Sequence, residues 1–179
     1  MLPGDEPEVS RVLAACDDYL IEATGSPALP ADVQSLYYSL PEGADFEQKR
    51  LLVLCDGAAT VGVVDAVVGH PDGDSCSVGL FLLDPEVRRK GVGTRVARHL
   101  LREAAARGLR RVTATCPESW LPGIVFLRTL DFEVHPPQQE PAPTVGNRLR
   151  FPTERGLCTA VRELDEASLG TVHRGRSAS

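Results

Sequence analysis

Residues 82–101 read LLDPEVRRKGVGTRVARHLL, and the order of secondary-structure elements is clearest in this stretch. It begins at the end of a continuous apolar run, residues 75–83, which is typical of a buried strand. Three cations and two glycines follow at positions 88–93. From Val92 onward, apolar residues recur at helical spacing until Gly108, a residue type that commonly ends helices. The stretch therefore predicts a strand, a tight turn and a long amphipathic helix in direct succession.

The turn between this strand and this helix has the composition of a phosphate site. Gly91 and Gly93 lack side chains where the chain enters the helix, so consecutive backbone N–H groups can approach an anion closely. The positive end of the helix dipole favours negative charge at the same place. Arg88, Arg89 and Lys90 add cations, which permits charge-assisted hydrogen bonds to a phosphate. We therefore expect a local anion site in a chain whose formal net charge is −6.

Two widespread phosphate-binding motifs do not fit this turn. The nucleoside-triphosphate loop requires a lysine directly after its second glycine, whereas Lys90 precedes both glycines here. The dinucleotide fingerprint G-x-G-x-x-G requires a glycine at position 96, which is Val96. Neither a nucleoside triphosphatase nor NAD binding is favoured, and the pattern that remains is Arg88-x-x-Gly91-x-Gly93.

The segments around this stretch complete an α/β pattern. The expected helices are residues 8–23, 31–40, 92–107 and 120–130, and the expected strands are residues 51–55, 60–69, 75–83, 110–116, 132–135 and 156–164. The Asp-Gly pair at 56–57 predicts a hairpin, and the helix at 92–107 predicts a crossover between parallel strands. The fold class is therefore α/β of the α+β type, with a mixed, mostly antiparallel central sheet of about six to seven strands flanked by about four helices.

Length and composition set further limits. The 179 residues, 42% of them hydrophobic, suit one domain, which we place at residues 1–164, followed by a flexible C-terminal tail at 165–179. The acidic balance argues against a general nucleic-acid binder. Five cysteines without a C-x-x-C pair fit neither a disulfide framework nor a zinc site, so we expect reduced thiols and no metal. The chain shows no signal peptide and no membrane span, so we expect a soluble cytoplasmic protein.

With a strand, Asp-Pro, Arg88, both glycines and the amphipathic helix in this order, residues 82–101 resemble the pyrophosphate-binding motif of the GNAT superfamily of N-acetyltransferases. The resemblance implies acetyl-CoA as the acyl-donor cosubstrate, with its pyrophosphate on the turn and its pantetheine arm along the preceding strand. It also implies that this strand splays from the strand after the long helix, with Gly79 marking a bulge. The cofactor-binding residues that it implies are Leu82, Leu83, Arg88, Arg89, Lys90, Gly91, Val92, Gly93 and Thr94.

The later part of the chain departs from the family pattern. That pattern usually looks like N-x-x-A-x-x-F-Y-x-x-x-G-F, in which the tyrosine is the acid that protonates the thiolate. This chain keeps Phe126 and Phe132 but has Leu127, which cannot donate a proton. The candidate catalytic acids lie near the end of the strand at 110–116 and are Cys116, Ser119 and, acting through a water, Glu118. Cys116 also fits a buried apolar filler, and Ser119 also fits a helix cap.

The candidate general base is Asp65, inside the strand at 60–69. A carboxylate in a mostly apolar strand is costly to bury unless it is paired or solvated by a cleft. An exposed position on an alternating strand is the other interpretation. Tyr37 and Tyr38, on the second expected helix, are candidates for the acceptor pocket.

These inferences predict an N-acetyltransferase that moves an acetyl group from acetyl-CoA to a primary amine of a small molecule, by direct attack in a ternary complex. The alternative is a non-catalytic acetyl-CoA-binding module of the same fold, which Leu127 favours. A nucleic-acid module built on the arginine-rich helix is disfavoured by the acidic balance. The expected partner is the amine acceptor, and we expect neither nucleic acid nor a membrane as a partner. The sequence leaves open whether the chain forms a homodimer.

Overall fold

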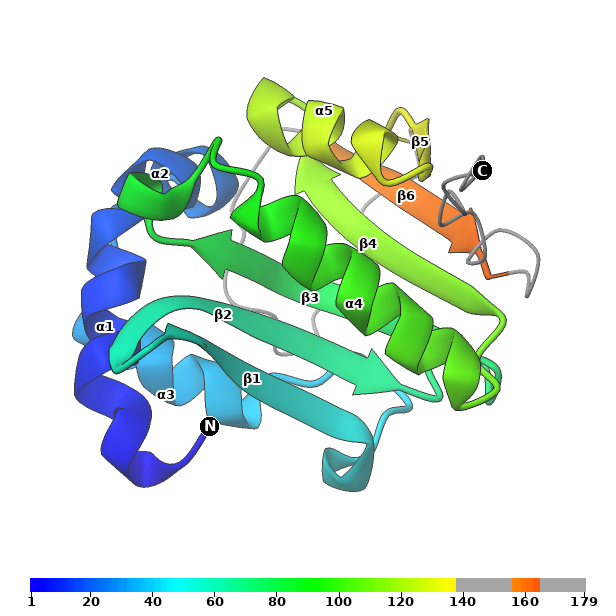
Figure 1. The fold of residues 1–179 in the computed structure, drawn as a ribbon, viewed down its shortest axis with the longest axis horizontal. Coiled ribbons are helices and arrows are strands. Elements are labelled where there is room, and N and C mark those ends of the chain that lie inside the picture. Colours follow the sequence, from blue (N-terminus) through cyan, green and yellow to red (C-terminus); the bar gives the residue numbers. More distant parts are fainter. Residues whose placement is uncertain (138–155, 165–179) are drawn as a thin grey trace, which may run out of the picture.

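A six-stranded sheet lies at the centre of the computed structural model, which describes residues 1–137 and 156–164 (Figure 1). Its strands are β1 (Lys49–Asp56), β2 (Ala59–Val68), β3 (Ser75–Leu83), β4 (Arg111–Pro117), β5 (Glu133–His135) and β6 (Leu157–Glu163). They lie in the order β1-β2-β3-β4-β6-β5, with β3 and β4 parallel and every other neighbouring pair of these strands antiparallel. The prediction of a mixed, mostly antiparallel sheet is confirmed, while the expected tail at 165–179 lies outside the described residues.

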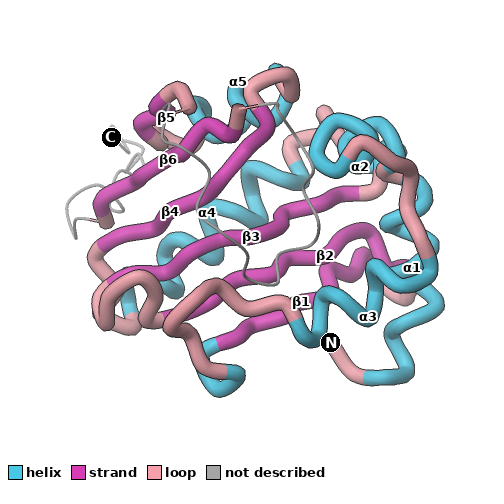
Figure 2. The backbone as a smooth tube through the Cα atoms, turned by 180° about the vertical axis from the view of Figure 1, so that it is seen from behind, coloured by secondary structure: helices cyan, strands magenta, loops and turns pink. Residues whose placement is uncertain are grey.

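Within the same residues, five α-helices surround the sheet. They are α1 (Glu6–Ala15), α2 (Asp17–Thr24), α3 (Pro30–Tyr38), α4 (Val92–Ala106) and α5 (Leu121–Thr129), together with the short turns η1 (Pro3–Asp5), η2 (Phe46–Gln48) and η3 (Pro85–Val87). Helix α4 crosses the face seen in Figure 1, and α3 lies over the face seen in Figure 2. A buried cluster forms on each face: Leu101 of α4 packs with Val112 on one, and Val12 and Leu36 pack with Val63 on the other.

The hairpin between β1 and β2 forms where the Asp-Gly pair predicts it. Asp56 pairs with Ala59, so Gly57 and Ala58 make a two-residue turn. Gly57 adopts a φ of +60°, a conformation that hairpin turns of this length require and that glycine reaches without strain.

The predicted first helix, residues 8–23, is two helices in the structure. The break falls at Cys16, whose φ of −101° and ψ of 26° leave helical geometry. Its side chain is fully buried, and its thiol donates to the Leu83 carbonyl oxygen at 3.3 Å. Just after the break, the Asp18 carboxylate accepts from the Arg88 guanidinium at 2.6 Å. These long-range contacts turn α2 toward the segment that precedes α4.

Strands β3 and β4 pair over only half of their length. Their parallel ladder has four residue pairs and ends at Val78 and Ala114. Beyond these residues, Gly79–Leu83 of β3 and Thr115–Pro117 of β4 are not paired with each other. We call this parting of the two backbones the wedge, and it confirms the expected splay.

A bulge marks the start of the wedge. Gly79 has no partner in β2, because Asp65 pairs with Leu80 and the next residue, Ala66, pairs with Val78. The bulge that the resemblance implied at Gly79 is therefore confirmed, and it changes the direction of β3 where its ladder with β4 ends.

Candidate functional site

The turn from Arg88 to Gly91 joins β3 to α4, and Asp84 fixes the chain just before it. The Asp84 carboxylate accepts a hydrogen bond from the Glu86 N–H at 3.0 Å and lies 2.8 Å from the Arg11 guanidinium. The hydrogen bond from Arg11, followed by that from the Glu86 backbone, holds the pKa of Asp84 below its ordinary value of 3.8. An ionised carboxylate thus anchors the entry to the turn.

The backbone N–H groups of this turn form a continuous row without partners. Arg89 and Gly91 adopt φ values of +60° and +76°, in the left-handed region. Within the described residues, none of the six consecutive N–H groups from Arg89 to Thr94 donates a hydrogen bond. Arg95 is the first residue of the helix to do so, at 3.1 Å from the Gly91 carbonyl oxygen. Such rows of amides at a turn and a helix start are anion-binding concavities.

The two glycines of the turn serve different purposes. A side chain on Gly91 would have space, because an added Cβ meets only Arg95 Nη1 at 3.5 Å, so this position needs glycine for its positive φ. A Cβ on Gly93 would lie 3.1 Å from Leu83 Cδ1 and 3.3 Å from Phe126 Cε2. Gly93 therefore lets the first turn of α4 pack closely against both β3 and α5.

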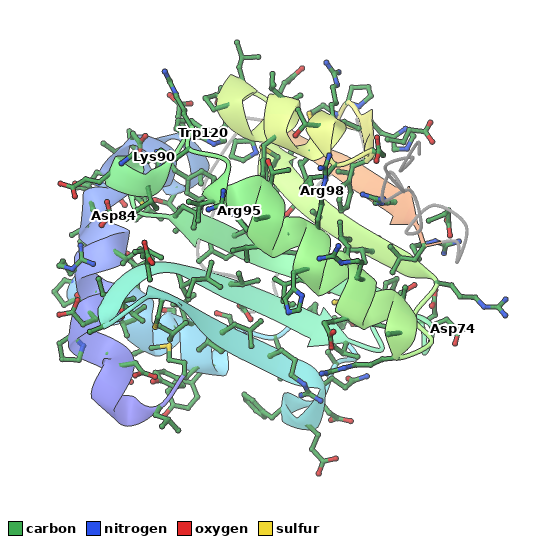
Figure 3. The ribbon with its side chains drawn as sticks, in the orientation of Figure 1. Asp74, Asp84, Lys90, Arg95, Arg98 and Trp120 are labelled. Atoms are coloured by element: carbon green, nitrogen blue, oxygen red, sulfur yellow. The ribbon has the colours of Figure 1, made fainter. Side chains whose placement is uncertain are left out.

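The three cations of the turn differ in their surroundings. Arg88 folds back, donating from Nε to the last carbonyl oxygen of β3 at 2.8 Å and from Nη1 to Asp18 at 2.6 Å. It fastens the turn to α2 and does not extend beside the row of amides. Arg89 and Lys90 are exposed, and no ion pair involves either of them in the described part of the chain. Figure 3 shows Lys90 and Arg95 at the N-terminal end of α4.

Phe81 and Leu83 direct backbone groups into the wedge. The Asp84 N–H bonds to the Val61 carbonyl oxygen of β2 at 2.9 Å, so alternation turns the backbone groups of Leu82 toward β2 as well. The Leu83 carbonyl oxygen faces the other way, where it accepts from the turn. The sequence predicts cofactor-binding backbone groups at Leu82 and Leu83. The strand register points the backbone groups of Phe81 into the wedge, whereas those of Leu82 point toward β2.

Asp65 lies beside the bulge in a largely buried ion pair. Lys49 Nζ is 2.8 Å from both carboxylate oxygens and also donates to the Ser39 carbonyl oxygen at 2.7 Å. The side chains of Lys49 and Asp65 are 7% and 13% exposed, so the interpretation of Asp65 as an exposed strand residue is wrong. Burial raises the pKa of Asp65, and the hydrogen bond from Lys49 opposes that rise. A Cβ on Gly79 would lie 3.9 Å from Asp65 Oδ2.

Cys116 and Ser119, the candidate acids, both have protein partners. Cys116 is buried, its Sγ lies 3.8 Å from the Trp120 carbonyl oxygen, and burial raises its pKa to about 11. A Cβ on Gly123 would lie 2.8 Å from this sulfur, so α5 closes over it. Ser119 Oγ donates to Glu22 at 2.5 Å and does not cap α5, whose N-cap is Trp120. These surroundings favour packing for Cys116 and a tie to α2 for Ser119.

A pocket opens between α1, α2, α3 and the bulge of β3. Most of its lining is apolar, and the polar side chains in it are Tyr19, Thr24 and Asp32. Tyr37 and Tyr38, the residues expected at an acceptor pocket, do not line it. Tyr37 donates its hydroxyl to the Leu2 carbonyl oxygen at 3.2 Å, and Tyr38 is 71% exposed.

Tyr19 is the residue of this region that sequence reasoning missed. Its ring packs edge-on against Trp120, with 5.7 Å between ring centroids and 72° between planes. The available signal was the acidic pair Asp17 and Asp18, which is typical of a helix start and would have divided the predicted helix just before Tyr19.

Three further features bear on chemistry. All five cysteines are free thiols. In residues 1–137 and 156–164, no group of three His, Cys, Asp or Glu side chains is arranged to hold a metal ion. The helices in those ranges also lack the length and apolar character needed to cross a bilayer.

Comparisons with known proteins agree with this geometry. The model of the acetyltransferase (GNAT) family matches residues 15–132. Similar solved structures include an acetyltransferase from Thermus thermophilus, at 22% identity and a TM-score of 0.66, covering 92% of this chain and 94% of that one. Another is the ribosomal-protein-S18-alanine N-acetyltransferase from Escherichia coli, at 14% identity and a TM-score of 0.56, covering 99% and 96%. A GCN5-related N-acetyltransferase from Kribbella flavida shares 20% identity with a TM-score of 0.60, covering 92% and 95%. A search of curated proteins finds no match.

Proposed function

Because the chain belongs to the GNAT family of acetyltransferases, we propose that it moves an acetyl group from acetyl-CoA to the primary amine of a small molecule. The row of N–H groups from Arg89 to Thr94 carries this proposal, since it lacks acceptors within the described residues and a pyrophosphate supplies them. Exposed Arg89 and Lys90 add positive charge to the same end of α4. Arg88 contributes by holding the turn to Asp18.

The wedge is the proposed place of the thioester. The N–H groups of Phe81 and Leu83 face the parting between β3 and β4, where they suit the carbonyl oxygens of a pantetheine arm. A backbone N–H at this place also suits a carbonyl oxygen that gains negative charge during attack. Acetyl-CoA brings the activated acyl group, and the chain orients it and surrounds it with donors.

The acceptor is proposed to enter from the face that carries α1 and α3. The pocket beside Gly79 opens there, and its mostly apolar lining suits an amine with a compact apolar part. Asp65, next to the same bulge, is the proposed general base, because burial brings its pKa closer to the working range of a base. Both of its oxygens accept from Lys49, so proton uptake requires this pair to loosen. Asp65→Asn tests the role through the acidic limb of the kcat profile against pH.

The alternative is a module that binds acetyl-CoA without turnover. Leu127 in the place of a tyrosine motivates it, as do the existing partners of Cys116 and Ser119.

The free thiols agree with the proposal of a reducing, cytoplasmic location. Light scattering of the purified protein tests the homodimer that the sequence leaves open.

Calorimetry with acetyl-CoA, CoA and ATP is the first test. We expect saturable binding of the two CoA species and none of ATP. Thiol release is then measured with a panel of polyamines, aminoglycosides, amino acids and a peptide N-terminus, the last because the Escherichia coli neighbour is named for an alanine of a ribosomal protein. Amine-dependent thiol release supports the transferase, binding without release supports the module, and absence of binding refutes the site.

A further inference from the structure

A leucine stands where the family motif places its proton-donating tyrosine. Leu127 packs against a buried cluster that contains Cys116 and Cys158, and its side chain has no proton to give. The sulfur that departs from a thioester nevertheless carries developing negative charge, and a hydrogen-bond donor stabilises it. Either water or a side chain from another element of the chain supplies this donor.

Tyr19 of α2 lies where the wedge and the pocket meet. It lines the pocket together with Gly79 and Leu80 of β3. Its ring also packs against Trp120, which follows β4, with 5.7 Å between ring centroids. Cys116 of β4 lies near enough that its thiolate, once formed, adds to the rise in the pKa of Tyr19 that burial causes. Tyr19 therefore has neighbours on both strands that part to form the wedge.

The hydroxyl of Tyr19 is available to a ligand. Tyr19 is half-buried, and its hydroxyl makes no hydrogen bond within the described residues. Burial raises the pKa of Tyr19 to about 12, so the phenol stays protonated at neutral pH. A protonated phenol donates a charge-assisted hydrogen bond to an atom that gains negative charge.

Contacts on both sides hold α2 in this position. Asp18 is tied to Arg88 of the turn at 2.6 Å, and Glu22 is tied to Ser119 after β4 at 2.5 Å. Tyr19 sits between these two ties on the same short helix. Its ring is thereby oriented before any ligand arrives, which lowers the entropic cost of a catalytic contact.

Resting on the proposed function, we propose that Tyr19 is a catalytic residue that protonates the departing CoA sulfur. The amine nitrogen forms a bond to the acetyl carbon, and the carbon–sulfur bond breaks with its electron pair going to sulfur. The phenol proton passes to this sulfur. The attacking nitrogen loses its proton to the proposed base Asp65, which releases it to solvent, and the phenolate takes a proton back from solvent, so an amide and a free thiol are formed with no net change in protons.

The test compares Tyr19→Phe with Tyr37→Phe. Phenylalanine keeps the packing of the Tyr19 ring on Trp120, and Tyr37→Phe removes a hydroxyl whose partner is the Leu2 carbonyl oxygen. Thermal unfolding checks that both variants fold. We measure kcat and KM with the best amine of the panel, and separately titrate the ultraviolet thiolate absorbance of the CoA complex against pH.

We expect Tyr19→Phe to lower kcat by about 100-fold with little change in the KM for acetyl-CoA. In the CoA complex it raises the pKa of the bound thiol by about one unit, since one charge-assisted hydrogen bond is lost. Tyr37→Phe changes neither quantity. A bound-thiol pKa equal to that of the wild type overturns the assignment, even when kcat falls, because the tyrosine then acts only through structure. The thiol titration needs no turnover, so it judges Tyr19 even where every amine fails and the proposed transfer is refuted.

Discussion

Replacing Gly91 tests the proposed anion site most directly. A side chain fits at this position without a steric clash, so the effect of an added charge can be measured apart from the effect of added volume. An added Cβ at Gly91 has open space and meets only Arg95 Nη1 at 3.5 Å. The φ of +76° costs any non-glycine residue about 1 to 2 kcal/mol of stability. Gly91→Ala and Gly91→Glu therefore share the same backbone strain, and they differ in that only the glutamate brings a carboxylate close to the row of amides.

The magnitude follows from the charge that the glutamate adds. At a separation of about 5 Å and an effective dielectric constant of about 20, a carboxylate and one phosphate charge repel by about 3 kcal/mol. This repulsion corresponds to a loss of somewhat more than 100-fold in affinity. The new carboxylate also lies within reach of the Arg95 guanidinium, and pairing with it removes a cation from the ligand. We expect Gly91→Glu to bind acetyl-CoA at least 100-fold more weakly than Gly91→Ala.

Calorimetry at one fixed ionic strength measures both variants, and thermal unfolding measures their shared loss of stability. Gly91→Ala is the matched control, because it carries the strain without the charge. If Gly91→Glu binds acetyl-CoA within threefold of Gly91→Ala, while both unfold at the same temperature, the row of amides is not the pyrophosphate site.

Two further variants test the electrostatics of the fold. Lys49→Met leaves the Asp65 carboxylate buried without its partner, so we expect a loss of about 3 to 5 kcal/mol at neutral pH in urea unfolding. Because the folded-state pKa of Asp65 is raised, this loss shrinks as the pH falls and the carboxyl protonates; a loss that does not depend on pH would contradict the argument. Asp84 is the opposite case, because Arg11 lowers its pKa in the folded state, so its contribution is present above the unfolded pKa near 4 and disappears as the pH falls through the lower folded value. Wild type should therefore lose more stability than Asp84→Asn between pH 6 and pH 3, and equal losses would show that Asp84 is not a stabilising charge.

Local signals predicted much of the fold because they act within a few residues. The Asp-Gly pair set the β1–β2 turn, and the glycines after Arg88 marked the start of α4. The break at Cys16 was not visible, since it depends on contacts with Leu83 and between Asp18 and Arg88, about 70 positions away. Periodicity alone therefore joined two helices into one.

In the candidate site, too, features set by nearby residues were predictable from the sequence, and features set by distant contacts were not. The turn proposed to bind the pyrophosphate was visible because backbone conformation and residue type coincide at Gly91. The choice of Phe81 over Leu82 needs the strand register, which composition does not encode. Tyr19 was missed for the reason that α2 was missed: a helix far from the motif brings it to Trp120.

The short ladder between β3 and β4 has a mechanical consequence for the whole molecule. The sheet is hydrogen-bonded across this seam by four residue pairs, while the strands on each side pair over longer stretches. The seam is where the two halves of the sheet separate most easily, and a ligand that bonds to both sides acts as a clamp. We expect acetyl-CoA to slow amide hydrogen exchange in β2 and β6 together, although neither strand borders the wedge, because opening of the seam exposes both halves at once.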